Sequence, residues 1–154
     1  MALYSPELCL VTLSNPAKGI ALSLPGLLAG FAAGTFIEAK RSEKAFKQKA
    51  GIGRATRVKT ARYDGEVTLT LMKESEFNAA LGAIIALDEL GADQVFQLKI
   101  QDLSGVQTYA MSAGVDAGFA GPPDLKASDD ADDIQYTILV PRLLLLQSGH
   151  VRPA

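Results

Sequence analysis

Few side chains in this sequence could carry out catalysis. His150 is the only histidine and Cys9 the only cysteine. A catalytic triad or a histidine-based zinc site needs several such groups held close together, so one of each supports neither. Cys9 lies in an apolar run typical of a strand, which favours a buried thiol over a nucleophile. The sequence therefore predicts no catalytic residues, and we expect no enzyme.

Two short motifs resemble ligand-binding loops, but each lacks essential members. The stretch GIGRAT at 51–56 has two glycines of a dinucleotide loop, yet it has no third glycine and follows no apolar strand. The acidic stretch DDADD at 129–133 lacks the glycine and the closing glutamate of a calcium loop. We therefore expect neither a metal site nor a cofactor.

The most unusual composition lies between Thr35 and Tyr63. This segment holds nine bases and two acids, a local charge of +7, while the whole chain carries -2, so the remainder carries -9. Gly51-Ile52-Gly53 lies near its middle and predicts the tip of a long hairpin, with arms at 35–49 and 54–63. The arms have few large apolar residues, so the hairpin is expected to project from the body.

Three functions fit such a hairpin. It could bind nucleic acid, although such sites usually interleave bases with aromatic residues, and few aromatics are present. It could be a plain solvated hairpin. The favoured hypothesis is a basic arm that docks on an acidic surface of another copy, since oppositely charged parts of one chain suit head-to-tail association. The candidate docking residues are Lys40, Arg41, Lys44, Phe46, Lys47, Lys49, Gly51, Gly53, Arg54, Arg57, Lys59 and Arg62. The candidate receiving residues are Asp129, Asp130, Asp132 and Asp133.

The remaining chain alternates in ways typical of antiparallel strands. In 66–72 the apolar Val67, Leu69 and Leu71 alternate with Glu66, Thr68 and Thr70, which predicts a strand with one wet face. A helix follows, with Ser75 as N-cap, an apolar stripe of Phe77, Leu81, Ile84 and Ile85, and Gly91 at its end. Further strands are expected at 7–13, 20–24, 35–40, 94–101, 106–113 and 134–146.

These elements predict one mainly β, α+β domain over 1–154: an antiparallel β-barrel or sandwich with one packed helix and a long projecting hairpin. Residues 147–154 are expected to be a flexible tail. The uncharged run at 19–34 is shorter than a membrane span and is broken by Pro25, so we expect a soluble protein with no membrane partner.

Several stretches resemble the tail tube proteins of contractile-tailed bacteriophages. They are MALYSPELCLVTL, GFAAGTFIEAKRSEKAF, TRVKTARYDGEVTLTLMKESEFNAAL, QDLSG and GPPDL, in the same order over most of the chain. The resemblance implies hexameric rings whose sheets join into one β-barrel and stack into a tube, with the helix outside and Lys40 to Arg62 reaching the adjacent ring.

The same resemblance implies partners and a location. They are other copies of the chain, sheath, tape-measure and baseplate proteins, and DNA that passes through the bore without sequence-specific binding. The particle would be a virion tail assembled in the bacterial cytoplasm, and Glu66, Thr68 and Thr70 would suit a polar lumen. Two alternatives stay open: the inner tube of a bacteriocin or secretion machine, and a small nucleic-acid- or ligand-binding β-barrel.

Overall fold

A computed structural model describes residues 9–25, 31, 37–44, 46–59, 63–102, 107–123 and 133–145. Its strands are β1 (Cys9–Asn15), β2 (Ile20–Pro25), β3 (Ile37–Arg41), β4 (Phe46–Gly51), β5 (Arg54–Lys59), β6 (Gly65–Leu71), β7 (Gln97–Asp102), β8 (Gln107–Ser112), β9 (Gly118–Phe119), β10 (Ile134–Val140) and β11 (Leu143–Leu145). Its helix α1 spans Phe77–Leu87 and continues into a π-helical turn at Asp88–Ala92, and a short 3₁₀ helix spans Pro16–Lys18.

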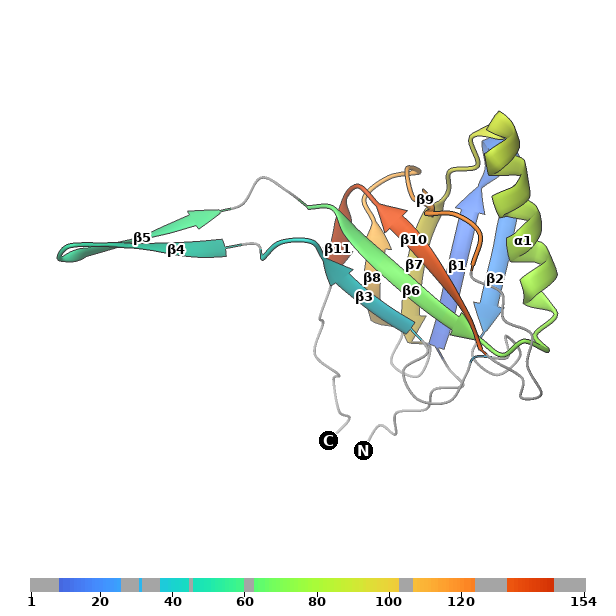
Figure 1. Cartoon of the computed structure of the whole chain (residues 1–154), viewed down its shortest axis with the longest axis horizontal. Helices are drawn as coiled ribbons and strands as arrows, with labels where there is room; N and C mark the ends of the chain where they lie inside the picture. Colours follow the sequence, from blue (N-terminus) through green and yellow to red (C-terminus); the bar gives the residue numbers. More distant parts are fainter. Residues whose placement is uncertain are drawn as a thin grey trace.

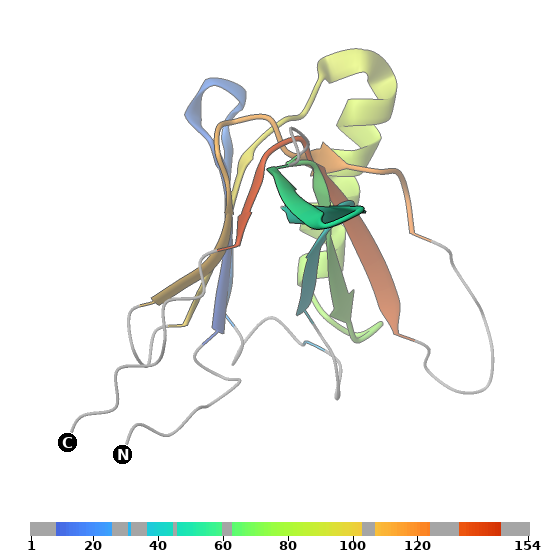
Figure 2. The ribbon, with the colours of Figure 1, turned by 90° about the vertical axis from the view of Figure 1, so that its left-hand side faces the viewer.

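Two antiparallel sheets face each other and form a sandwich (Figures 1 and 2). One sheet has the order β11-β8-β7-β1-β2, and the other has the order β3-β6-β10-β9. The predicted mainly β class with one packed helix is confirmed. Of the two predicted forms, the sandwich is the one observed, because the described strands close no barrel and each sheet ends in edge strands.

The core lies between the sheets and follows the alternation in the sequence. Val67, Leu69 and Leu71 of β6 are fully buried, as predicted, while Glu66 is exposed. The inner face of β1 carries the buried Cys9, Val11 and Leu13, so β1 has the same alternation of buried residues as β6 on the opposite sheet. An aromatic group completes the core, in which Phe119 packs against Phe96 with 5.4 Å between ring centroids and against Tyr136 with 6.2 Å.

Helix α1 lies in the same layer as the four-stranded sheet. It occupies the end of the sandwich at which β2 forms the edge of the opposite sheet (Figures 1 and 2). Its buried residues are Leu81 and Ile85, both members of the predicted stripe. The N-cap position is Glu76 and not Ser75 as predicted, and Glu76 makes no side-chain capping bond. Ser75 Oγ instead accepts a hydrogen bond from the Phe77 N–H at 3.3 Å. Gly91, predicted as the end of the helix, lies inside the π-helical turn and interrupts it with φ +89, a left-handed value that favours glycine, while α1 itself ends at Leu87.

Strands β4 and β5 pair only with each other among the described strands and project from the sandwich (Figure 1). The predicted hairpin was too long at its first end. Ile37 to Arg41 form β3, which pairs with β6 inside the four-stranded sheet. The reason is that Ile37 and Ala39 pack against the core, although this strand has only modest apolar content.

Two other sequence-based expectations concern the ends and the uncharged run. The predicted tail at 147–154, together with His150, lies outside the described residues. Of the run at 19–34, residues 20–25 form β2, and most of the rest is also outside the described residues. None of the described helices is both long and apolar enough to span a membrane.

Candidate assembly interface

The projecting hairpin, residues 46–59, is called the arm. Its strands are joined by a two-residue turn, Ile52-Gly53, in which Gly53 has φ +72. Every residue of the arm is exposed, and Ile52 at the tip is fully exposed. An isolated two-stranded hairpin is only marginally stable in water. Because no residue of the arm is buried, packing against the body adds little to the stability of the arm.

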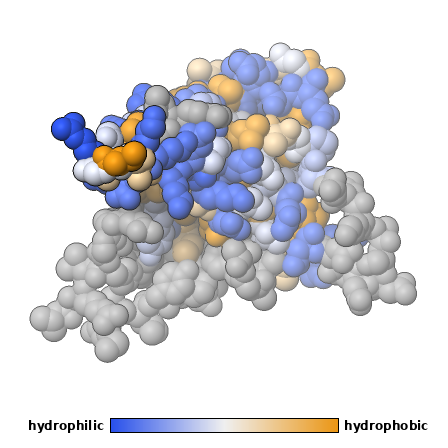
Figure 3. Space-filling model, turned by 60° about the vertical axis from the view of Figure 1, so that its left-hand side comes forward, coloured by the Kyte–Doolittle hydropathy of each residue, from blue (hydrophilic) through white to orange (hydrophobic). Residues whose placement is uncertain are grey.

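The cross-strand register divides the arm into two basic faces. One face carries Phe46, Gln48, Ala50, Ala55, Arg57 and Lys59, and the other carries Lys47, Lys49, Gly51, Arg54, Thr56 and Val58. On the first face the Arg57 guanidinium stacks over the Phe46 ring at 3.8 Å from its centroid. Figure 3 shows that the arm surface is mostly hydrophilic, with a small hydrophobic patch.

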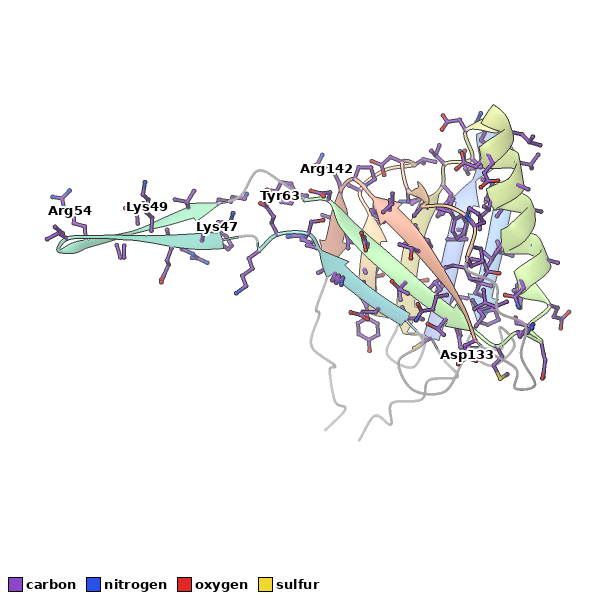
Figure 4. The ribbon with its side chains drawn as sticks, in the orientation of Figure 1. Lys47, Lys49, Arg54, Tyr63, Asp133 and Arg142 are labelled. Atoms are coloured by element: carbon purple, nitrogen blue, oxygen red, sulfur yellow. The ribbon has the colours of Figure 1, made fainter. Side chains whose placement is uncertain are left out.

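Most charges of the arm are not neutralised by the described parts of the chain. Lys47 lies 3.7 Å from Glu43, in an exposed i, i+4 pair. Exposed pairs of this kind contribute little to stability. Lys49, Arg54 and Arg57 make no ion pair with any described residue. Figure 4 shows Lys47, Lys49 and Arg54 spread along the arm, away from the sandwich.

The other predicted docking residues lie at the root of the arm or in the body. Lys40 and Arg41 belong to β3, where Lys40 is exposed opposite Glu66 and the Arg41 Nε–H donates to the Leu143 carbonyl at 2.9 Å. Lys44 is exposed in the connection from β3 to the arm, and Arg62 lies outside the described residues. The structure therefore divides the described docking residues into those of the arm and three at its base, Lys40, Arg41 and Lys44, and this base is called the root.

The structure brings two residues that the sequence analysis did not select, Tyr63 and Arg142, into the root. Tyr63 follows the arm and lies beside Arg142, which precedes β11 (Figure 4). Lys59 at the end of the arm and Arg41 of β3 lie near the same ring. Arg142 is distant in sequence from the other three residues, so no local sequence pattern could have shown its contact with Tyr63.

The predicted receiving residues are only partly described. Asp129, Asp130 and Asp132 lie outside the described residues, while Asp133 is exposed just before β10. Because Ile134 pairs with Leu71, Asp133 lies beside the chain that leaves β6 toward the helix. That chain carries the exposed Glu74 and Glu76, which the sequence analysis missed. Figure 4 places Asp133 at the part of the body remote from the arm.

Both sheets present a polar outer face. On the four-stranded sheet, the exposed Glu66 and the half-buried Thr68 and Thr70 share this face with Glu38, Lys40, Gln135, Thr137 and Leu139. On the five-stranded sheet the outer face carries Thr12, Ser14, Ser23, Gln97, Lys99 and Gln101, together with the half-buried apolar side chains of Leu10, Met111 and Leu144. The second face is the less charged of the two. The structure therefore offers two polar faces that could line a lumen.

The described residues contain no cluster of histidine, cysteine, aspartate and glutamate that could hold a metal ion. Cys9 is buried in the core, as predicted, and the GIGRAT stretch forms the turn and first residues of a hairpin strand. The described part of the chain thus presents an exposed arm, open sheet edges and polar sheet faces.

Comparisons with known proteins add a fold-level likeness. No protein-family model matches the chain, and no curated protein matches it. Among solved structures, the anti-feeding prophage cap, described as the cap that terminates its tube, is similar with a TM-score of 0.51 and 16% sequence identity. The match covers 95% of this chain and 94% of the other. The chain therefore has the fold of a tube-terminating cap protein along nearly its whole length.

Proposed function

We propose that this chain is a structural, non-catalytic subunit of the tube of a phage-tail-like particle. The observation that carries the proposal is an arm with no buried residue and unneutralised charge, mounted on a sandwich with open sheet edges. The like charges on such an arm repel one another, and no packing within the described part of the chain compensates for this repulsion. We therefore expect the arm to act between chains. The likeness to a tube-terminating cap supports the same class of assembly.

The stacking contact would be head to tail. The arm of one subunit would lie along the next subunit and meet its acidic end, which includes Asp133, Glu74 and Glu76. Different surfaces meet in such a heterologous contact, so copies can add without limit and form a filament. The fit is electrostatic, with the +7 segment of one copy against the negative remainder of another.

The lateral contact would use the sheet edges. Strands β2 and β11 are the two edges of the five-stranded sheet. Pairing β2 of one subunit with β11 of the next would extend this sheet around a ring and remove both open edges. We propose hexameric rings of this kind, stacked into a tube, with a polar sheet face toward the bore. That face is either the Glu66, Thr68 and Thr70 face or the face of the five-stranded sheet.

The particle is proposed to be the contractile tail of a phage, in which the tube conducts DNA during ejection. DNA would pass without sequence-specific contacts, because neutral or acidic polar walls do not retain phosphates. A bacteriocin or secretion tube, and a cap subunit at the end of a tube, follow the same subunit logic. In each case the other partners would be tail or sheath components of that particle.

The test is a triple charge reversal on the arm and its approach, Lys44→Glu, Lys47→Glu and Arg54→Glu. We expect the variant to fold normally and to form no filaments by negative-stain microscopy, while the wild type forms rings or hollow filaments. A control reverses Lys18, which lies outside the arm, the acidic end and the polar sheet faces, and Lys18→Glu should still polymerise. Unchanged filaments in the arm variant would contradict the proposal. Salt-sensitive binding of a duplex oligonucleotide by monomers that never assemble would favour the nucleic-acid alternative.

A further inference from the structure

Three cations surround one aromatic ring where the arm leaves the body. The guanidinium carbons of Arg41 and Arg142 lie 5.4 Å and 5.8 Å from the centroid of the Tyr63 ring, and the Lys59 Nζ lies 5.9 Å from it. Arg41, Lys59, Tyr63 and Arg142 are called the Tyr63 cluster. It joins β3, the arm, the connection to β6 and the β10–β11 turn.

The Tyr63 cluster is held by backbone contacts, so its members do not meet by chance. The Leu143 N–H donates to the Tyr63 carbonyl at 2.9 Å, and the Leu143 carbonyl accepts the Arg41 Nε–H at the same distance. Leu143 is itself fully buried in the core. The ring and two of its cations are therefore fixed to the sandwich, while Lys59 arrives from the arm.

The cations of this cluster form no ion pair with the described residues. None of Arg41, Lys59 and Arg142 forms an ion pair with a described carboxylate. Attraction between a cation and an aromatic face is weak at an exposed site and does not neutralise the charge. Lys59 and Arg142 are exposed, so an anion can reach them from solvent. A concentrated, accessible positive site of this kind favours a bound anion.

We propose that the Tyr63 cluster is an anion-binding site that receives carboxylates of a second copy of this chain. The inference rests on the proposed head-to-tail assembly and adds a second contact point to it. The described carboxylates available at the remote end of the body are those of Glu74, Glu76 and Asp133. The root would contact carboxylates of the neighbour's acidic end, and the arm would run on from there along the same neighbour.

A carboxylate partner fits better than nucleic acid for two reasons. The Tyr63 ring is already surrounded by cations, so it is poorly placed to stack on a base as single-strand binding sites require. The rest of the chain is strongly negative and would repel a long polyanion beyond this one point. A short acidic surface, in contrast, contacts only the root.

The planar guanidinium of Arg142 is expected to matter more than its charge alone. An arginine can bind a carboxylate through two parallel N–H donors, which a lysine ammonium cannot reproduce. We therefore expect Arg142→Lys to assemble less well than the wild type, and Arg142→Gln to assemble less well again. A role limited to net charge would leave Arg142→Lys unchanged.

The experiment measures the concentration of purified full-length protein at which polymers form, by sedimentation, for Arg142→Gln, Lys59→Gln and the remote control Lys18→Gln. We expect the first two to raise this concentration roughly fivefold or more, as the loss of an interface ion pair does, and the control to match the wild type. Lys59 lies on the exposed arm, so its variant decides the matter if Arg142→Gln fails to fold.

The outcomes separate this inference from the proposed function. Normal polymerisation of both cluster variants, with failure of the triple arm variant, would overturn the inference alone. Absence of polymers in the wild type would overturn both. An unchanged polymerisation threshold, combined with loss of duplex binding in Arg142→Gln, would reassign the cluster to nucleic acid. A raised threshold that Glu76→Arg restores in Arg142→Glu would support the carboxylate contact directly.

Discussion

Tyr136 is a buried residue whose hydroxyl joins the four-stranded sheet to helix α1. The hydroxyl donates to Asn78 Oδ1 at 2.9 Å, and the Asn78 side-chain amide donates in turn to the carbonyls of Met72 and Lys73. Burial raises the pKa of Tyr136 above its ordinary value near 10. The pKa of Tyr136 is therefore lower in the unfolded chain than in the folded one. The stability that the neutral, buried hydroxyl contributes is complete below pH 10 and is lost as the pH rises through the folded pKa.

Tyr136→Phe should therefore have two effects on stability. At neutral pH it removes one hydrogen bond and leaves Asn78 Oδ1 short of a donor, which should cost about 1 kcal/mol of unfolding free energy. Above pH 10 the difference from the wild type should shrink, because phenylalanine does not ionise. Urea unfolding followed by circular dichroism at pH 7 and pH 10.5 measures both. A gap that widens at the higher pH would contradict the assigned role of burial.

Gly65 is the residue where a side chain has no room. A Cβ placed there would lie 2.6 Å from the Lys40 carbonyl oxygen and 2.6 Å from the Leu143 Cδ2. Gly65→Ala should lower the unfolding free energy by roughly 1–3 kcal/mol, the usual range for an overpacked core. Gly82→Ala is the matched control, because Gly82 is exposed in α1 with no atom within 4 Å of the new Cβ, and should raise stability by up to about 1 kcal/mol. Equal effects of the two substitutions, measured by thermal unfolding, would refute the crowding argument.

At the scale of elements, the edge strand β2 is open to pairing with another chain. It carries no charged residue and ends the five-stranded sheet. Natural edges that must stay unpaired usually carry charges, especially lysine. Ala21→Lys with Ser23→Lys, both at exposed positions, should leave the thermal midpoint nearly unchanged and should weaken lateral association. Sedimentation velocity tests this, with the helix-surface variant Ala83→Lys as the control, and rings that persist in the double variant would exclude β2 as the lateral contact.

Elements with a clear period could be predicted from the sequence, and elements defined by distant partners could not. The alternation in β6 and the stripe of α1 each identified the buried residues, because one face of each element packs on the core. The sequence predicts a strand at 35–40 but places it in the first arm of the hairpin, because the whole segment 35–63 is basic and has few large apolar residues. Only the pairing with β6 shows that it belongs to the sheet.

The same limit applies to the candidate interface. The arm was found from composition and the Gly51-Ile52-Gly53 turn, which are local signals. The Tyr63 cluster depends on Arg142, which reaches the root only because β11 follows β10 back across the sandwich. Glu74 and Glu76 join Asp133 through the register of β6 with β10, which no local pattern contains. Long-range contacts of this kind depend on the whole fold and cannot be predicted from residues that are neighbours in the sequence.

At the scale of the whole molecule, the arm and the sandwich are expected to be energetically separate. No arm residue is buried, and the arm strands pair only with each other among the described strands. Removing residues 46–59 and closing the gap with a short Gly-Ser linker should therefore leave the thermal midpoint of the body almost unchanged, since no core contact is lost.

The same deletion should separate the two modes of association. Lateral pairing depends on the sheet edges, which the deletion leaves intact, so rings should still form. Stacking depends on the arm, so filaments should be absent at every salt concentration, whereas wild-type filaments should shorten as salt rises because their contacts are charged. Negative-stain microscopy distinguishes single rings from filaments in one experiment. Filaments made by the armless variant would show that stacking uses the faces of the sandwich alone, and a body that unfolds without its arm would show that the two parts are not independent.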